Sequence, residues 1–249
     1  RTKFGRRLEN AARIALNPTP RRQGSRQDRF ENPPMIASRL AATLALSLAL
    51  THTPDEVSIY GLDLSGGGLA RVEPFPHVGG VATRSDRERI GRLLDELLTM
   101  VRARETVFRE RGIDSLPVLR ARHARGEVPE IVAPDVVLLV DGFAQLRGEF
   151  EEFEERLMEL LARGGSFGIH LVLGMNRWND LPMRQQSHIG QRIEFRLNDP
   201  MDSQVGRKIA DTLKAAGPGR AVTDDGLFGQ VALPVQTVVD DEEIGPALE

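Results

Sequence analysis

Residues 135–142, Asp-Val-Val-Leu-Leu-Val-Asp-Gly, constrain the fold of this chain more than any other stretch. A run of branched apolar side chains needs burial on both faces, which is typical of an inner strand of a parallel sheet. The run ends on Asp141, so its carboxylate is expected at the C-terminal edge of that strand. Ligands of open α/β sheets bind at this edge. The stretch therefore predicts an α/β fold with a carboxylate placed where a ligand would bind.

An aspartate in this place commonly holds Mg²⁺ in P-loop nucleotidases. Such a protein also needs a Gly-x-x-x-x-Gly-Lys-Ser/Thr loop, whose backbone N–H groups and lysine cradle the phosphates. The chain has three lysines, Lys3, Lys208 and Lys214, and none of them stands in such a loop. The sequence thus predicts a nucleotidase fold in which half of the phosphate site is missing.

Composition excludes several classes of protein. With 249 residues, of which 40% are hydrophobic and 28% charged, the chain is long enough to bury a substantial core. A net charge of −3 disfavours a protein dedicated to nucleic acid. The absence of cysteine excludes disulfides, zinc–thiolate sites and thiol nucleophiles. The most apolar run, residues 35–50, contains Arg39 and is shorter than the roughly 20 residues that span a bilayer, so no transmembrane segment is expected.

Three regions are expected along the chain. Residues 1–34 form a basic lead-in rich in Pro and Arg, which we expect to be poorly ordered. Residues 35–239 contain alternating helical and strand patterns and should fold as one module with parallel strands. Residues 240–249 form an acidic linker stub.

The apolar pattern predicts a buried helix at 35–51 and four strands of one sheet. The second and third strands should be central because their apolar runs are unbroken; the four strands are 57–62, 136–141, 168–173 and 192–197. A long helix should begin with a capping box of Ser85 and Glu88, and another helix is expected at 148–163.

Eight short strings occur in a fixed order: Thr51-His-Thr-Pro54, Leu62-Asp-Leu-Ser-Gly-Gly-Gly-Leu69, Pro76-His-Val-Gly-Gly-Val81, Val140-Asp-Gly-Phe143, Gly168-Ile-His-Leu-Val172, Asn176-Arg-Trp178, Asp199-Pro200 and Pro218-Gly-Arg220. Together they resemble the FtsK/SpoIIIE-type ATPase modules of EccC, the motor subunit of actinobacterial type VII (ESX) secretion. The likeness covers residues 43–233. The strings at 140 and 176 resemble the second of the tandem modules.

The resemblance implies a three-layer RecA-like P-loop NTPase fold with a mostly parallel central sheet, and ATP and Mg²⁺ as ligands. It implies work on the export of small helical-hairpin substrates, together with other ATPase modules and membrane subunits of a secretion complex. It also implies a hexamer at the cytoplasmic face of the cell membrane. Nucleic acid is not expected as a partner, because the chain after residue 30 is acidic.

The chain departs from this family at two points. Ile36-Ala37-Ser38 stands where the family has Gly-Lys-Ser, so Ser38 can reach a metal ion but Ala37 cannot bind a phosphate charge. Upstream, the prolines of Glu31-Asn-Pro-Pro34 lack the N–H groups that a phosphate loop uses. Gly142 stands where many related motors have a glutamate that positions the attacking water.

None of the candidate site residues is assigned a catalytic role. Asp141 either holds Mg²⁺, if ATP binds, or caps a nearby loop. Asn176 either senses the γ-phosphate or forms the turn before Arg177. Arg220 either serves the phosphates of a neighbouring subunit or is a charge at a hairpin edge. If the pocket descends from a working one, Asp141 should face the start of helix 35–51, with Ser38 as its nearest hydroxyl.

The favoured hypothesis is a degenerate or truncated ATPase module that acts as a structural, regulatory or docking domain. Such a module would keep at most a few residues of an ancestral nucleotide site, and it would not hydrolyse ATP by itself. The alternative is an active ATP-binding translocase subunit, for protein or DNA, whose P-loop is lost from this sequence. Met35 begins the family-like region, which is compatible with the alternative.

Overall fold

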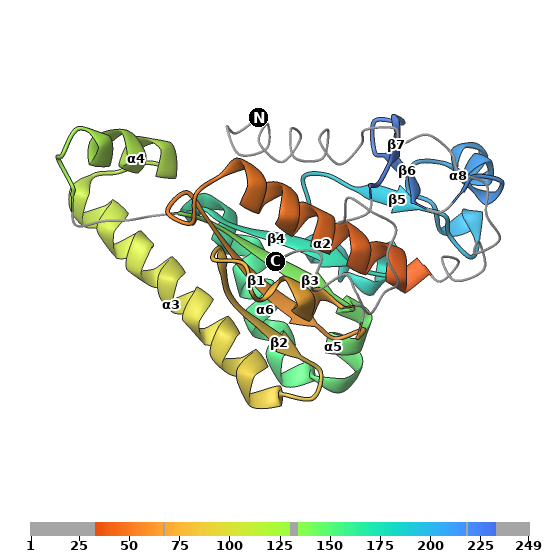
Figure 1. The fold of residues 1–249 in the computed structure, drawn as a ribbon, viewed down its shortest axis with the longest axis horizontal. Helices are drawn as coiled ribbons and strands as arrows, with labels where there is room; N and C mark the ends of the chain where they lie inside the picture. The colour runs from red at the N-terminus through yellow and green to blue at the C-terminus, as the bar shows by residue number, and fades with distance from the viewer. Residues whose placement is uncertain (1–32, 67, 130–133, 218, 233–249) are drawn as a thin grey trace.

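The computed structural model of the chain describes residues 33–66, 68–129, 134–217 and 219–232. Four parallel strands form one sheet in the order β2-β1-β3-β4. Helices cover both faces of this sheet (Figure 1), so the predicted three-layer α/β fold is confirmed. The strands of this sheet are β1 (Val57–Asp63), β2 (Val78–Thr83), β3 (Asp135–Asp141) and β4 (Ile169–Gly174).

The helices vary from single turns to one of 25 residues. The α-helices are α2 (Pro33–Thr51), α3 (Arg87–Arg111), α4 (Leu116–Ala124), α5 (Phe143–Glu149), α6 (Glu151–Arg163), α7 (Met183–Gln186) and α8 (Arg207–Lys214). The 3-10 helices are η2 (Leu69–Val72), η3 (Gly164–Phe167), η4 (Trp178–Asp180) and η5 (Pro200–Asp202).

Strand β3 is buried along its whole length, as its apolar run predicts. Successive side chains of a strand point to opposite faces. Val136, Leu138 and Val140 therefore join the cluster formed with α3 and α6. Val137 and Leu139 join the second cluster, under α2. Strand β3 thereby fixes the helices of both outer layers relative to one sheet.

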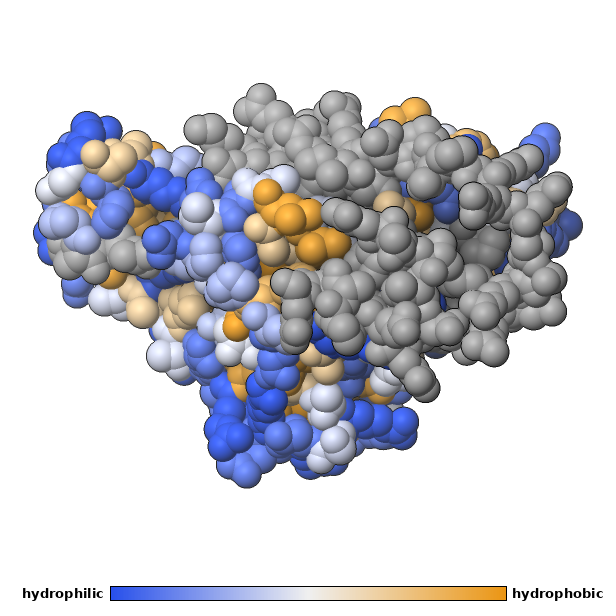
Figure 2. Space-filling view, in the orientation of Figure 1, coloured by the Kyte–Doolittle hydropathy of each residue, from blue (hydrophilic) through white to orange (hydrophobic). Residues whose placement is uncertain are grey.

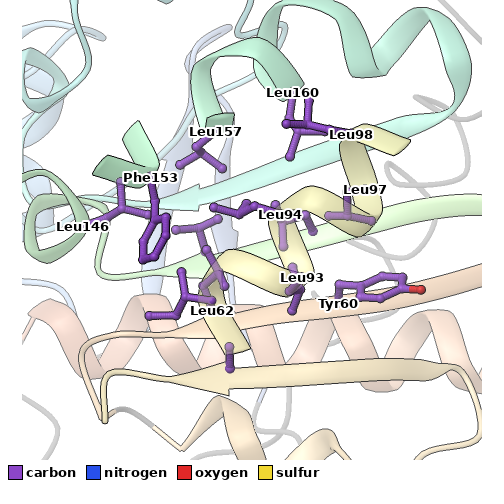
Figure 3. Close-up of a cluster of buried hydrophobic side chains, with 14 of the residues drawn as sticks. Tyr60, Leu62, Leu93, Leu94, Leu97, Leu98, Leu146, Phe153, Leu157 and Leu160 are labelled. Carbon is purple, nitrogen blue, oxygen red and sulfur yellow. The ribbon is translucent and has the colours of Figure 1, made fainter. Parts of the chain in front are cut away.

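The larger cluster lies between the sheet and helices α3, α5 and α6 (Figure 3). Helix α3 places Leu94 and Leu97 against it at helical spacing, and α6 adds Leu157 and Leu160. Fully burying a leucine side chain stabilises a fold by about 1.5–3 kcal/mol. The outer side of α3 is polar, and the surface around its N-terminal end is hydrophilic (Figure 2). The helix is therefore held by its apolar face.

The strand predicted at 192–197 lies outside the main sheet, so this prediction is wrong. Strand β5 (Ile193–Phe195) pairs antiparallel with β6 (Arg220–Thr223), which pairs with β7 (Phe228–Gln230). This segment alternates apolar and charged residues, and Ile193 remains 41% exposed. Such alternation suits a strand covered on one face rather than an inner parallel strand. Strands β6 and β7 form a hairpin.

The predicted central place of 168–173 is also wrong. Strand β4 pairs only with β3 in the described part of the chain, and the central strands are β1 and β3. After Ile169, the residues of β4 are only partly buried. An apolar run indicates that helices cover a strand on its faces. It does not show whether the strand lies inside the sheet or at its edge.

Two helix boundaries differ from the sequence prediction. The N-cap of α3 is Asp86, whose carboxylate accepts a hydrogen bond from the N–H of Arg89 at 2.9 Å, and not Ser85. The helix predicted at 148–163 is two helices, α5 and α6, which meet at Phe150. Phe150 is buried there and lies against Phe153 with ring centroids 6.4 Å apart. The break therefore turns both rings toward the core.

A buried charged cluster joins the sheet to α3 and α4 at the N-terminal end of β3. The carboxylate of Asp135 accepts a hydrogen bond from Arg120 of α4 at 2.8 Å and lies 3.2 Å from Nε2 of His170. Arg104 of α3, also buried, donates to the carbonyls of Phe167 and Pro134. Burial and, to a smaller extent, the positive charge of the neighbouring Arg120 lower the pKa of Arg104 to about 10. The contact of His170 with the buried Asp135 indicates a structural role for this histidine.

We predict that Asp135→Ala destabilises the fold by about 1.5–3 kcal/mol, the range for hydrogen bonds to charged groups. Burial acts to raise the pKa of Asp135, but hydrogen bonds from His170 and Arg120 outweigh it and hold that pKa below its usual value. A depressed pKa adds stability that is present above about pH 4 and is lost at lower pH. Chemical unfolding of wild type and Asp135→Asn from pH 7 to pH 3 should show their difference shrinking below pH 4. A pH-independent difference would contradict this.

Candidate functional site

The carboxyl ends of β1 and β3 bring two buried aspartates together. Asp63 and Asp141 are register partners at the last position of the paired strands. Their exposed fractions are 4% and 2%. Asp63 accepts a hydrogen bond from the N–H of Ala70 at 3.1 Å, which ties the loop after β1 to this edge. The edge therefore carries two carboxylates beneath the start of α2.

Asp141 faces the N-terminal part of α2, as expected from the sequence. The hydroxyl of Ser38 donates to Oδ2 of Asp141 at 2.5 Å, and both residues are buried. The backbone carbonyl of Asp141 accepts the N–H of Leu64 at 2.9 Å, which holds the loop after β1 in place. The predicted contact between Ser38 and Asp141 is confirmed. Whether either residue serves a nucleotide stays a prediction.

The surroundings of Asp141 raise its pKa. Burial raises the pKa of Asp141, the negative charge of Asp63 raises it further, and hydrogen bonds from Ser38 and Ser65 act in the opposite direction. The net direction is upward. In a P-loop protein a lysine and a metal ion supply positive charge close to this carboxylate. Ala37 supplies none here, so the pair of aspartates is left without a cation from that position.

The backbone of the expected phosphate loop is helical. Helix α2 begins at Pro33, so the residues just before Ser38 form the first turn of the helix rather than a loop around phosphates. Pro33 and Pro34 have no N–H to offer. The side chain of Ala37 reaches the end of β4, where a Cβ placed on Gly174 would lie 3.6 Å from the Cβ of Ala37. Compared with a phosphate loop, this segment therefore offers fewer free backbone N–H groups and less space for phosphates.

A cavity of about 10 Å³ remains at this edge. It is lined by Ala37, Ser65, Asp141, Gly142, Ala144, Gln145, Gly174, Met175 and Asn176. A volume of roughly 10–15 Å³ accommodates one water molecule, so a triphosphate does not fit. Carboxylate and hydroxyl oxygens suit Mg²⁺, but Ser38 is already bonded to Asp141. The residues present do not fit Mg-ATP in this arrangement.

The other predicted site residues are divided by the fold. Asn176 follows β4 and lines the cavity next to Asp141. Arg220 begins β6 and does not line this cavity; its guanidinium lies 5.5 Å from the ring centroid of Phe228. Gly142 has φ +91°, a left-handed conformation that favours glycine. A Cβ there would lie 2.5 Å from Oγ of Ser65. A glutamate at this position would therefore be strained and would require Ser65 to shift.

Sequence reasoning missed three polar residues at this edge. Asp63 is the partner of Asp141 across the sheet. Ser65 and Gln145 line the cavity. The sequence does carry a signal for Asp63, because it directly follows the strand predicted at 57–62. Gln145 gave no signal because α5, which carries it, was not predicted.

The described residues offer neither a clustered metal site nor a membrane-spanning helix. Within residues 33–66, 68–129, 134–217 and 219–232, no cluster of three or more His, Asp or Glu side chains is arranged to hold a metal ion. None of the helices in these ranges is both long and apolar enough to cross a membrane.

Comparisons with known proteins show the family of this chain. The model of the FtsK/SpoIIIE family matches residues 38–236. The ESX secretion system protein EccC of Thermomonospora curvata is 43% identical over 197 residues, which are 79% of this chain and 15% of that protein. The chain thus spans about a seventh of that relative.

Solved structures give the same result. The cytoplasmic domain of the type VII secretion ATPase EccC of T. curvata superposes with a TM-score of 0.80 at 40% identity, over 87% of this chain and 25% of that one. A structure of ATPases 2 and 3 of the same EccC with a signal sequence peptide gives a TM-score of 0.78 at 40% identity, over 85% and 38% of the two chains. The RecA-like P-loop fold is therefore confirmed, and the chain belongs to the FtsK/SpoIIIE family.

Proposed function

We propose that this chain is a degenerate ATPase module of a type VII secretion motor, and that it acts in protein export as a structural, regulatory or docking domain. The observation that carries the proposal is the closed pocket. Helix α2 starts where the phosphate loop would be, Ala37 replaces the lysine, and Ser38 is bonded to Asp141 above a cavity of about 10 Å³. The fold of the family is kept while the space for phosphates is not.

The similarity to EccC supports the place of this module in a secretion complex. Its partners would be other ATPase modules and membrane subunits, and it would lie at the cytoplasmic face of the cell membrane within a hexameric assembly. The EccC structure solved with a signal sequence peptide supports export substrates as the cargo of the motor, and these would be small helical hairpins. Arg220 would serve a neighbouring subunit in that assembly.

A second candidate function is an active ATP-binding translocase whose P-loop is lost from this sequence. One observation favours it: Ser38 and Asp141 keep the mutual geometry of a hydroxyl and a carboxylate that could share a metal ion. In that case Asp141 would hold Mg²⁺ and Asn176 would face the γ-phosphate. A DNA translocase is distinguished by DNA binding that weakens steeply with salt.

We predict that wild-type protein binds Mg-ATP with a Kd weaker than about 100 μM and shows no turnover above background. The missing lysine and amides remove charge-assisted contacts that contribute roughly 1.5–3 kcal/mol each, and every 1.4 kcal/mol is about tenfold in affinity. Isothermal calorimetry with Mg-ATP measures the affinity, and Asp141→Asn is the matched control. A low-micromolar Kd that the control abolishes would refute the degenerate module.

We predict opposite effects of two substitutions of Asp141 on stability. Asp141→Ala leaves the buried hydroxyl of Ser38 without its acceptor, which costs about 1–3 kcal/mol, and the partly buried hydroxyl of Ser65 also loses its bond. Asp141→Asn keeps an acceptor and removes a buried charge, so it should be at least as stable as wild type at pH 7. Because the folded pKa of Asp141 is raised, its ionisation lowers stability as the pH rises through that pKa. The advantage of Asp141→Asn should therefore shrink as the pH falls from 7 toward 4.

The measurement is thermal unfolding of wild type, Asp141→Asn and Asp141→Ala with and without Mg-ATP. Neither substitution changes a catalytic rate if the module does not hydrolyse ATP. A rise in the Tm of wild type alone on adding Mg-ATP would mean that Asp141 still holds a metal ion.

A further inference from the structure

The outer edge of β4 is a surface that the candidate site does not use. Strand β4 pairs with β3 along one side, and in the described part of the chain no strand pairs with its other side. In a parallel ladder, alternate residues direct both their N–H and their C=O groups toward the same neighbour. The N–H of Val136 donates to the carbonyl of Gly168 at 2.8 Å, so the even-numbered residues of β4 face β3. Leu171 and Leu173 therefore direct their backbone groups to the open side.

This edge lacks the features that keep edge strands from pairing. Natural edges carry charged side chains, prolines or bulges, whereas Ile169–Gly174 contains no Asp, Glu, Lys, Arg or Pro and pairs with β3 in an unbroken register. Leu171 and Leu173 pack against the larger cluster, and Val172 packs against the cluster under α2. All three are only partly buried. Strand β4 thus presents apolar side chains on both faces, as a strand with two neighbours does.

The connections of the sheet indicate what would lie at this edge. Helix α3 leads from β2 to β3, α5 and α6 lead from β3 to β4, and all three pack on one face (Figure 1). These connections run from the side of β2 toward that of β4, and crossovers between parallel strands are right-handed. Helices α2 and η2 pack on the opposite face, where a right-handed connection must run the other way. The connection from β1 through η2 to β2 does so.

A strand that led through α2 into β1 would therefore come from the side of β4. Strands β3 and β4 fill the places beside β1, so its position would be the open edge of β4. In P-loop proteins such a strand leads into the phosphate loop and its helix. The described residues place no strand there. The β-branched residues of 1–32 are Thr2, Ile14 and Thr19, which are separated in sequence, so this segment does not have the composition of a buried strand.

We propose that the open edge of β4 binds an extended, uncharged apolar segment of a partner chain, which adds to the sheet as a further strand. Hydrogen bonds to the backbone groups of Leu171 and Leu173 would supply affinity, and alternate side chains of the segment would cover the two faces of the edge. An apolar segment without charge fits because β4 carries no acidic residue, lysine or arginine. The inference rests on the docking role in the proposed function, and it gives that role a surface and a kind of partner.

The test uses the full chain without nucleotide and a fluorescent peptide, Lys-Thr-Val-Ile-Val-Val-Thr-Lys. Its matched control has proline at the two central positions, and proline cannot donate to a ladder. We expect wild type to bind the first peptide at least about tenfold more tightly than the second. At about ten times the Kd of the first peptide, amide hydrogen exchange of Leu171 and Leu173 should slow by about tenfold.

Two variants place a charge at the two edges of the same sheet. Val172→Lys changes the edge formed by β4, and Val78→Lys is the matched control at the edge formed by β2. Both valines are partly buried and pack against the same cluster. Because a lysine on an edge strand opposes pairing, Val172→Lys should weaken peptide binding by at least about tenfold, whereas Val78→Lys should leave it unchanged. Should Val172→Lys fail to fold, the two peptides and the exchange rates in wild type decide by themselves.

Three outcomes would overturn the proposal. The first is equal binding of the two peptides, which would show apolar adhesion without strand pairing. The second is no binding of either peptide, as when another segment of the chain already covers the edge. The third is a wild-type dimer that Val172→Lys dissolves, which would assign the edge to a second copy. Nucleotide is absent throughout, so failure here is distinct from failure of the degenerate phosphate site, which Mg-ATP binding by wild type would show.

Discussion

The contact between the start of α2 and the end of β3 determines what this module can do. Two apolar faces of one strand set the position of the outer layers, and the face formed by Val137 and Leu139 sets that of α2. Once α2 lies there, its first turns stand over the carboxyl edge of β3. In a P-loop protein this arrangement places phosphates between the helix and the aspartate. Here the hydroxyl of Ser38 reaches the carboxylate of Asp141 directly, at 2.5 Å. In the degenerate module that we propose, the same packing joins the helix to the strand where phosphates would otherwise lie.

The closed site leaves two buried carboxylates side by side, which is unfavourable unless hydrogen bonds or protons compensate. Asp63 accepts from the backbone of Ala70, while Asp141 accepts from Ser38 and Ser65. These bonds do not outweigh burial and the charge of Asp63, because the pKa of Asp141 is still raised. A buried aspartate also lies at the N-terminal end of β3, but it has different partners. There Asp135 accepts hydrogen bonds from Arg120 and His170, and its pKa is lowered although burial acts to raise it. Strand β3 thus carries an aspartate with a lowered pKa at its N-terminal end and one with a raised pKa at its C-terminal end.

The sequence predicted those features that depend on a single strand or helix. The burial of β3, the apolar helix over Asp141, and the contact of Ser38 with Asp141 all follow from local patterns and the edge rule for α/β sheets. Features that depend on neighbours in space were predicted poorly. The place of β4 at one side of the sheet, and the separate sheet of β5, depend on which strand lies next to which. The amide of Gln145 was missed because its position depends on the left-handed backbone of Gly142, which no periodicity records.

The obstacles to nucleotide chemistry lie on separate elements, which explains why the fold can be kept when the chemistry is not. The helical first turn and Ala37 belong to α2, whereas the crowded position at Gly142 belongs to the junction of β3 and α5. Replacing Ala37 by lysine would add a cation but no amides and no space. Adding a carboxylate at residue 142 would demand a left-handed non-glycine residue and a shift of Ser65. The large cores that hold α2 and α3 to the sheet contain none of these positions. A family member that no longer needed turnover would therefore lose the phosphate site piece by piece, while burial continued to stabilise a module able to bind its neighbours.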